Sequence, residues 1–220
     1  HHTGVEIRVV AVGTGQAIKN MKNCDGDVLI THAKKAEIEF LKSGYGLKRF
    51  EIMYNNWVIV GPRKAKTEKD IRGHEIREIM EIIYDKKEKF ISRGDNSGTH
   101  MKELSLWQEL ALMPEEFSKT WYLETGSGQG ATLMIANELG AFTITDTATW
   151  YSFKNKGESE IVGYDNNDLN TYAITTVNPK KCKNVKSSAV EKIVTFLKSD
   201  NGKSAISKFR LNNANAFFPT

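Results

Sequence analysis

The sequence predicts an α/β fold, because short apolar segments alternate with longer segments whose apolar residues recur every three or four positions. Turns rich in Gly, Ser and Thr separate these segments. Such alternation is typical of α/β proteins with mainly parallel strands. No repeat of fixed period is present, which argues against a solenoid.

The composition is that of a globular protein with one large domain or two small lobes. The chain has 220 residues, of which 40% are hydrophobic and 26% are charged. The net charge of +4 arises from interspersed charges, which indicates a solvated surface rather than a nucleic-acid interface. No apolar run approaches the ~18 residues of a membrane span.

The first part of the chain is expected to alternate strands with helices. Strands are expected over residues 5–12, 28–30 and 57–60, and a helix over 33–41. A charged loop at 63–69 follows, and Asp70 is the predicted N-cap of the next helix. The apolar stripe of that helix is formed by Ile76, Ile79, Met80 and Ile83.

The rest of the chain continues the pattern. Strands are expected at 90–91, 121–123, 142–144 and 172–177, with Asp146 as an N-cap. One helix is expected to bury Met101, Leu104, Trp107 and Ala111, and another follows over 131–139. The spacing of Ser188 and Glu191 predicts a capping box before a helix with Val190, Ile193, Val194 and Leu197 on its apolar face. A last helix carries Ala205, Ile206 and Phe209. The tryptophans and Met134 are interpreted as core residues.

Three turns between a strand and a helix are rich in Gly, Ser and Thr, at residues 12–16, 92–99 and 125–132. The first N–H groups of a helix lack partners within the helix, and the helix dipole makes that end partly positive. Three such turns at one place would bind an anion. Each turn alone is also typical of an ordinary helix cap. None has the spacing of a dinucleotide or P-loop motif, so the expected ligand is small.

Arg93 is the leading candidate residue, because a guanidinium offers a fixed fork of donors to an oxyanion. Asp95 has several interpretations: it orients Arg93, it forms a solvated ion pair of little energetic worth, or it accepts the proton of hydrogen phosphate. If Asp95 pairs with Arg93, the site is expected to reject phosphate.

The sequence offers little for catalysis. It contains no Gly-x-Ser-x-Gly elbow, no His-Glu-x-x-His and no cysteine-pair metal motif. An enzyme acting on a phosphorylated small molecule would have only Asp95, His32 and His100 as candidate bases. Both histidines are interpreted as capping or surface residues, so we expect no enzyme, no catalytic residue, no metal site and no cofactor. Whether Cys24 pairs with Cys182 stays open.

Several segments resemble the tungstate-binding proteins, which are extracytoplasmic solute-binding components of tungstate ABC importers. Residues 9–17 resemble the family's second strand and turn, 25–33 its next strand, and 53–62 a crossover strand. The most diagnostic segments are 92–100, which reads Ser-Arg-Gly-Asp-Asn-Ser-Gly-Thr-His, and 121–133. The likeness runs through almost the whole chain in order.

This resemblance implies a two-lobed type II periplasmic-binding-protein fold. Lobe one is expected to comprise residues 1–62 and 173–220, and lobe two residues 63–172, with crossover strands at about 51–62 and 172–179. The family's first strand and its Thr/Ser-rich turn would precede His1, so we expect the printed chain to lack them.

The resemblance also implies an oxyanion site formed by Thr14, Arg93, Ser97, Thr99, Ala131 and Thr132. It implies that the protein is periplasmic, or membrane-anchored outside the cytoplasm. Its expected partners are tungstate and a permease with its ATPase, and no nucleic acid. Molybdate has nearly the same size and charge as tungstate and is the alternative ligand, with sulfate and phosphate behind it. A sensor domain of a regulator shares this fold, but two lobes leave no room for a DNA-binding helix pair.

Overall fold

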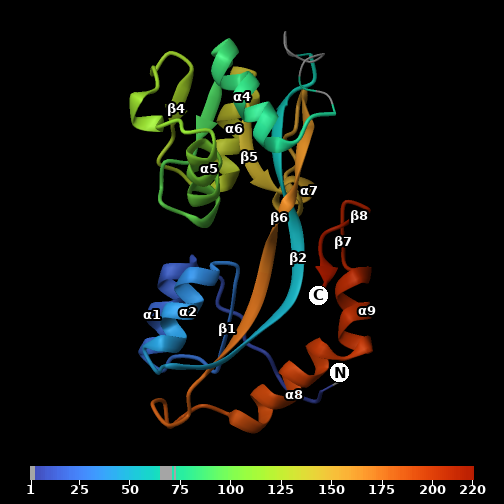
Figure 1. Ribbon diagram of the computed structural model, residues 1–220. Helices are drawn as coiled ribbons and strands as arrows, with labels where there is room; N and C mark the ends of the chain where they lie inside the picture. The colour runs from blue at the N-terminus through green and yellow to red at the C-terminus, as the bar shows by residue number, and fades with distance from the viewer. Residues whose placement is uncertain (1–2, 65–70, 72) are drawn as a thin grey trace. The chain divides into compact units, whose positions relative to one another are not determined.

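The computed structural model describes residues 3–64, 71 and 73–220, which form two compact units (Figure 1). Unit 1 comprises His1–Tyr54, Thr171–Arg210 and Asn215–Thr220, and unit 2 comprises Asn55–Asn170 and Leu211–Ala214. The predicted N-cap Asp70 and most of the predicted loop at 63–69 lie outside the described residues. The expected α/β architecture is confirmed, since helices and strands alternate along the chain.

Two long strands, β2 (Gly46–Pro62) and β6 (Ser159–Val177), contribute residues to both units. They are neighbours in a sheet of order β1-β6-β2-β5, in which β9 (Phe218–Pro219) also pairs with β2. β1 (Val28–Thr31) pairs with the end of β6, and β5 (Thr143–Asp146) pairs with the end of β2.

The expectation of mainly parallel strands is wrong for this sheet. The pairs β1–β6, β2–β5 and β2–β9 are antiparallel. Parallel pairing occurs between β3 (Phe90–Ser92) and β4 (Tyr122–Glu124) of unit 2, and at a bridge between Phe90 and Phe142. The difference arises because alternation of helices and strands along the sequence does not show in which direction the long strands β2 and β6 pair with β1, β5 and β9.

Unit 1 packs helices against its part of the sheet. Its remaining elements are α1 (Thr14–Lys22), α2 (Lys34–Lys42), α8 (Ser187–Lys198) and α9 (Asp200–Lys208). A small core joins Leu29, Phe40, Val177 and Cys182. Cys24 and Cys182, whose pairing the sequence leaves open, form a disulfide with a Cα–Cα distance of 5.3 Å.

The predicted strand at residues 5–12 is absent: this segment has no regular structure, and Val9 and Val10 are 82% and 73% exposed. An apolar alternating segment becomes a strand only when a neighbour accepts its backbone hydrogen bonds. Among the described residues, β1 has β6 as its single neighbour in the sheet. No strand of this sheet, over the same residues, includes residues 5–12.

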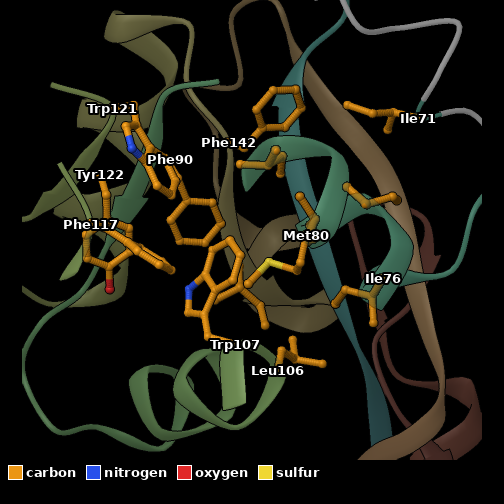
Figure 2. Close-up of a cluster of buried hydrophobic side chains, with 14 of the residues drawn as sticks. Ile71, Ile76, Met80, Phe90, Leu106, Trp107, Phe117, Trp121, Tyr122 and Phe142 are labelled. Carbon is orange, nitrogen blue, oxygen red and sulfur yellow. The ribbon is translucent and has the colours of Figure 1, made fainter. Parts of the chain in front are cut away.

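Unit 2 is built around a large aromatic core. Its helices are α4 (Ile76–Lys86), α5 (Gly98–Glu109), α6 (Gln129–Leu139) and α7 (Thr147–Ser152), with a short 3-10 helix at Pro114–Glu116. The predicted α4 stripe is buried, with Ile76, Ile79, Met80 and Ile83 each at most 2% exposed. It packs against Phe90, Trp107, Phe117, Trp121 and Tyr122 (Figure 2). The strands β7 (Arg210–Leu211) and β8 (Ala214–Asn215) form a separate pair.

Several local predictions are corrected. α4 has its capping box at Glu75 and Glu78, whereas α8 has none and begins after Lys186 without a side-chain cap. Met101 and Met134 are exposed, and Ala111 lies beyond the end of α5. On α5 the buried residues instead include Lys102 and Glu103, because each finds polar partners inside unit 2.

Candidate functional site

Two of the three predicted turns lie side by side in unit 2, because the strands before them are parallel neighbours. Ser92 at the end of β3 is opposite Glu124 at the end of β4. Parallel strands present their carboxyl ends at one edge, so the turns leading into α5 and α6 start there together. We call residues 93–97 the Arg93 turn and residues 125–128 the Thr125 turn.

Hydrogen bonds join the two turns. The Ser92 carbonyl accepts from the backbone N–H of Thr125 at 3.0 Å and from its hydroxyl at 3.3 Å. Arg93 Nη1 donates to Gln129 Oε1, in the first turn of α6, at 3.3 Å. Gln129 in turn donates through Nε2 to the carbonyl of Ile144 at 3.0 Å, so the sheet fixes the amide that holds Arg93. Sequence reasoning missed this role of Gln129.

Asp95 pairs with Arg93, which decides between the alternatives for this carboxylate. Arg93 Nη2 donates to Asp95 Oδ2 at 2.5 Å, and the Ser97 N–H donates to Asp95 Oδ1 at 3.1 Å. Partial burial acts to raise the pKa of Asp95, but the hydrogen bonds from Ser97 and Arg93 outweigh it and lower the pKa. Asp95 is therefore an ionised group whose two oxygens both accept hydrogen bonds within the turn, and it orients the guanidinium.

One nitrogen of the Arg93 guanidinium makes no hydrogen bond among the described residues. This nitrogen is Nε, and it is buried. The side chain as a whole is 16% exposed. A buried charged donor without an acceptor is costly unless a ligand supplies the acceptor. An anionic ligand beside Arg93 would supply this acceptor.

The start of α5 supplies the remaining predicted groups of the Arg93 turn. Ser97 is the N-cap, and its Oγ accepts from the N–H of His100 at 3.3 Å. The N–H of Ser97 donates to Asp95 Oδ1, so this residue is engaged within the turn through both its side chain and its backbone. Thr99 is the second residue of α5 and is buried. The helix dipole adds positive potential at this end.

The start of α6 is capped by Gly128 without a side-chain hydrogen bond. Ala131 is exposed in its first turn, whereas the fully buried Thr132 shares a 3.0 Å hydrogen bond with Thr125 and donates to the Gly128 carbonyl at 3.2 Å. The hydroxyl of Thr132 thus shapes the Thr125 turn.

Thr14 belongs to unit 1, where it is the first residue of α1 after the N-cap Gly13. Its participation in one site with the unit 2 turns stays a prediction. His32 lies in the same unit and stacks on Tyr172 with ring centroids 4.7 Å apart.

His100 is neither a surface residue nor a helix cap, so that interpretation is wrong. Only 6% of the residue is exposed, and its Nδ1 accepts the N–H of Asn96 at 3.0 Å. Since Nδ1 is an acceptor, the neutral ring carries its proton on Nε2, which is buried without a hydrogen-bond partner among the described residues. His100 therefore stabilises the Arg93 turn through this hydrogen bond from Asn96.

Gly94 is required by the backbone of the Arg93 turn. Its φ is +59°, and an added Cβ would lie 2.8 Å from the Cβ of Glu124. We expect Gly94→Ala to cost about 1 kcal/mol of stability and to weaken anion binding about threefold, because the turn shifts away from β4. Calorimetric titration with thermal unfolding measures both. Gly140→Ala is the matched control, since φ there is +57° with open space around the Cβ, and it should leave affinity unchanged. Equal affinities for the two variants would contradict this role of Gly94.

No group of three His, Cys, Asp or Glu residues within the described part of the chain is arranged to hold a metal ion. Over the same residues, no helix combines the length and the apolar character needed to cross a membrane. The Arg93 turn and the Thr125 turn of unit 2 provide hydrogen-bond donors around the oriented guanidinium of Arg93. A group of donors of this kind suits an oxyanion.

Comparison with known proteins identifies the family. The profile of the PBP superfamily domain matches residues 1–200. The tungstate-binding protein TupA of Peptoclostridium acidaminophilum is 40% identical over 214 residues, which cover 94% of this chain and 72% of that protein. Among solved structures, the tungstate-binding protein TupA from Desulfovibrio alaskensis G20 has a TM-score of 0.89 at 36% identity, and the match covers 100% of this chain and 88% of that one. The structure of the tungstate ABC transporter from Geobacter sulfurreducens has a TM-score of 0.80 at 38% identity, covering 91% and 84%.

The fold and these matches define a solute-binding protein of the periplasmic-binding-protein class, as the resemblance implied. The relatives are binding proteins and a transporter rather than enzymes. Within that class, the chain belongs to the family of the TupA tungstate-binding proteins.

Proposed function

We propose that this protein captures tungstate outside the cytoplasm and delivers it to an ABC importer made of a permease and an ATPase. The family supports this proposal, since relatives at 37–40% identity are named tungstate-binding proteins. The disulfide between Cys24 and Cys182 also supports it, because such bonds persist in oxidising compartments such as the periplasm. The proposal involves no catalysis, no cofactor and no nucleic acid.

The observation that carries the ligand class is the occupied carboxylate of Asp95. Both of its oxygens accept hydrogen bonds from the Arg93 turn, and its lowered pKa keeps it ionised. The turn therefore presents donors to a ligand and withholds its carboxylate. A fully ionised oxyanion needs only donors, whereas the proton of hydrogen phosphate needs an acceptor. The site thus favours tungstate or molybdate over hydrogen phosphate.

The proposed contacts are Arg93, Thr99 and the N–H groups around Ala131 in unit 2, with Thr14 from unit 1. Ser97 and Thr132 belong to the proposed site as the residues whose hydroxyls hold the two turns in shape. Arg93 supplies the charge, and the starts of α5 and α6 supply N–H donors and dipole potential.

Calorimetric titration with tungstate, molybdate, sulfate and phosphate tests the proposal. We expect tight binding of tungstate, comparable or weaker binding of molybdate, and no measurable phosphate heat, because phosphate at neutral pH carries a proton that the site cannot accept. Tight phosphate or sulfate binding without tungstate heat would overturn the proposal. Preference for molybdate over tungstate would keep the site and replace the ligand by the alternative.

A further inference from the structure

Helix α1, which begins at Thr14, has few contacts of its own to hold it in place. It has nine residues, and an isolated helix shorter than roughly 12 residues is marginal in water. None of these nine residues, all of which the structure describes, is buried. The N-cap is Gly13, which has no side chain to cap the first N–H groups. Residues 5–12 before it are irregular and mostly exposed, so the start of α1 gains little support from them.

The contacts that fix α1 lie toward its C-terminal end. Ala17, Ile18 and Met21 are partly buried against the small core of unit 1. Just beyond the helix, Cys24 forms the disulfide with Cys182, which is a buried member of the same core. The covalent bond therefore fastens α1 at the end opposite to Thr14.

Cys24 occupies a backbone position that favours glycine. Its N–H donates to the carbonyl of Met21 at 3.1 Å, and the N–H of Asp25 donates to the carbonyl of Asn20 at 3.0 Å. These two bonds define a Schellman motif, in which the residue at the place of Cys24 has a positive φ and is usually glycine. The φ of Cys24 is +64°, which is unfavourable for a residue with a side chain. A local preference is thus broken at the residue that carries the disulfide, which is typical of a position with a functional constraint.

Residues 182–186, which we call the Cys182 loop, hold the connection after α1 at two further points. Asn184 Nδ2 donates to the carbonyl of Cys24 at 2.7 Å. The N–H of Lys186 donates to Asp27 Oδ1 at 2.8 Å. Together with the disulfide, these bonds tie the C-terminal end of α1 to a part of the chain 158 positions away.

We infer that the disulfide between Cys24 and Cys182 is a positioning element of the anion site: it fixes α1 from its C-terminal end and so presents Thr14 and the first N–H groups of the helix to the ligand. This inference rests on the proposed function, in which Thr14 contacts the anion. Because α1 is one continuous helix of about 13 Å, the place of its last residue limits the place of its first.

Reduction of the disulfide is expected to weaken anion binding. A dithiol breaks the sulfur–sulfur bond: the two sulfur atoms gain two electrons and two protons and become thiols, and the dithiol is oxidised to its own disulfide. Without the bond, α1 is formed in only a fraction of the molecules, because a helix of this length is marginal. The apparent affinity falls by that fraction, since a ligand must wait for the state that binds it.

Calorimetric titration of the whole chain with tungstate tests the inference. The comparison includes the oxidised wild type, the wild type reduced by a dithiol that is then removed under nitrogen, and Cys24→Ser combined with Cys182→Ser. We expect both forms without the disulfide to bind about threefold to tenfold more weakly, and reoxidation to restore the affinity of the wild type. Hydrogen–deuterium exchange without anion should show faster exchange of the α1 amides in these two forms.

Ser199→Ala is the matched control for a general loss of stability. Ser199 is the N-cap of α9 in the same unit, and its Oγ accepts from the N–H of Gly202 at 3.3 Å. Its replacement should destabilise unit 1 while the exchange of the α1 amides and the tungstate affinity stay unchanged. An equal loss of affinity in this variant would mean that the disulfide acts through overall stability, and would overturn the inference.

The remaining outcomes separate the inference from the proposed function. If the oxidised wild type binds no tungstate, the proposed function fails and the inference with it. If the forms with and without the disulfide bind tungstate equally, or show the same α1 exchange, the inference is overturned while the function stands. Should the double variant fail to fold by circular dichroism, Asn184→Ala takes its place, because it keeps the disulfide and removes the hydrogen bond to the Cys24 carbonyl. Weaker binding with faster α1 exchange in Asn184→Ala supports the inference, and wild-type behaviour overturns it.

Discussion

Replacement of Arg93 by alanine is expected to weaken tungstate binding at least tenfold, which corresponds to about 1.4 kcal/mol. The guanidinium is the charged donor of the proposed site, it is mostly buried, and Asp95 and Gln129 hold it in place. Its loss removes a charge-assisted hydrogen bond, worth about 1.5–3 kcal/mol, and leaves Asp95 as an unpaired negative charge beside the anion. Isothermal titration measures the effect.

Arg77→Ala is the matched control for this variant. Arg77 is an exposed residue of α4 in the same unit and donates to the carbonyl of Glu109, so its removal deletes the same charge from the surface. We expect its tungstate affinity to stay within about twofold of wild type, because exposed charges at a distance are screened. An unchanged affinity for Arg93→Ala would show that the site lies elsewhere.

Loss of the disulfide is expected to lower the free energy of unfolding by about 3–5 kcal/mol. Cys24 and Cys182 are 158 positions apart, so the bond closes a long loop and removes much conformational freedom from the unfolded chain. Urea unfolding of the protein with and without reductant, followed by circular dichroism, measures the difference. The large value follows from the length of the loop rather than from contacts of the sulfur atoms.

The double variant Cys24→Ser with Cys182→Ser provides the control. The chain has two cysteines, so this variant should unfold at the urea concentration of the reduced wild type and should not respond to reductant. A difference below about 1 kcal/mol between oxidised and reduced wild type would contradict the prediction.

Local patterns predicted most of unit 2. The spacing of Ile76, Ile79, Met80 and Ile83 predicted α4 and its buried face. The turns after Ser92 and Glu124 are two of the three that were expected to bind an anion if they met, and they lie side by side because parallel strands end at one edge. Features of this kind are predictable because they depend on residues that are close in the sequence or on successive strand–helix units.

Contacts between distant parts of the chain were not predictable from such patterns. The segment 5–12 has the alternation of a strand, yet whether it pairs depends on a partner elsewhere. β6 was expected only from Tyr172, because its first half is rich in Asp and Asn, which are depleted in strands. The role of Gln129 depends on side-chain placement across two turns, because it lies 36 positions from Arg93 in the sequence.

The discontinuous make-up of unit 1 has a consequence for how the protein is made. Unit 2 takes almost all of its residues from the single stretch Asn55–Asn170, whereas unit 1 needs Thr171–Arg210 beside the first 54 residues. As the chain emerges from its N-terminal end, unit 2 can therefore acquire its core while the first part of unit 1 still lacks Thr171–Arg210. Cys24 likewise stays a free thiol until Cys182 has emerged, so closure of the covalent ring marks a late step in maturation.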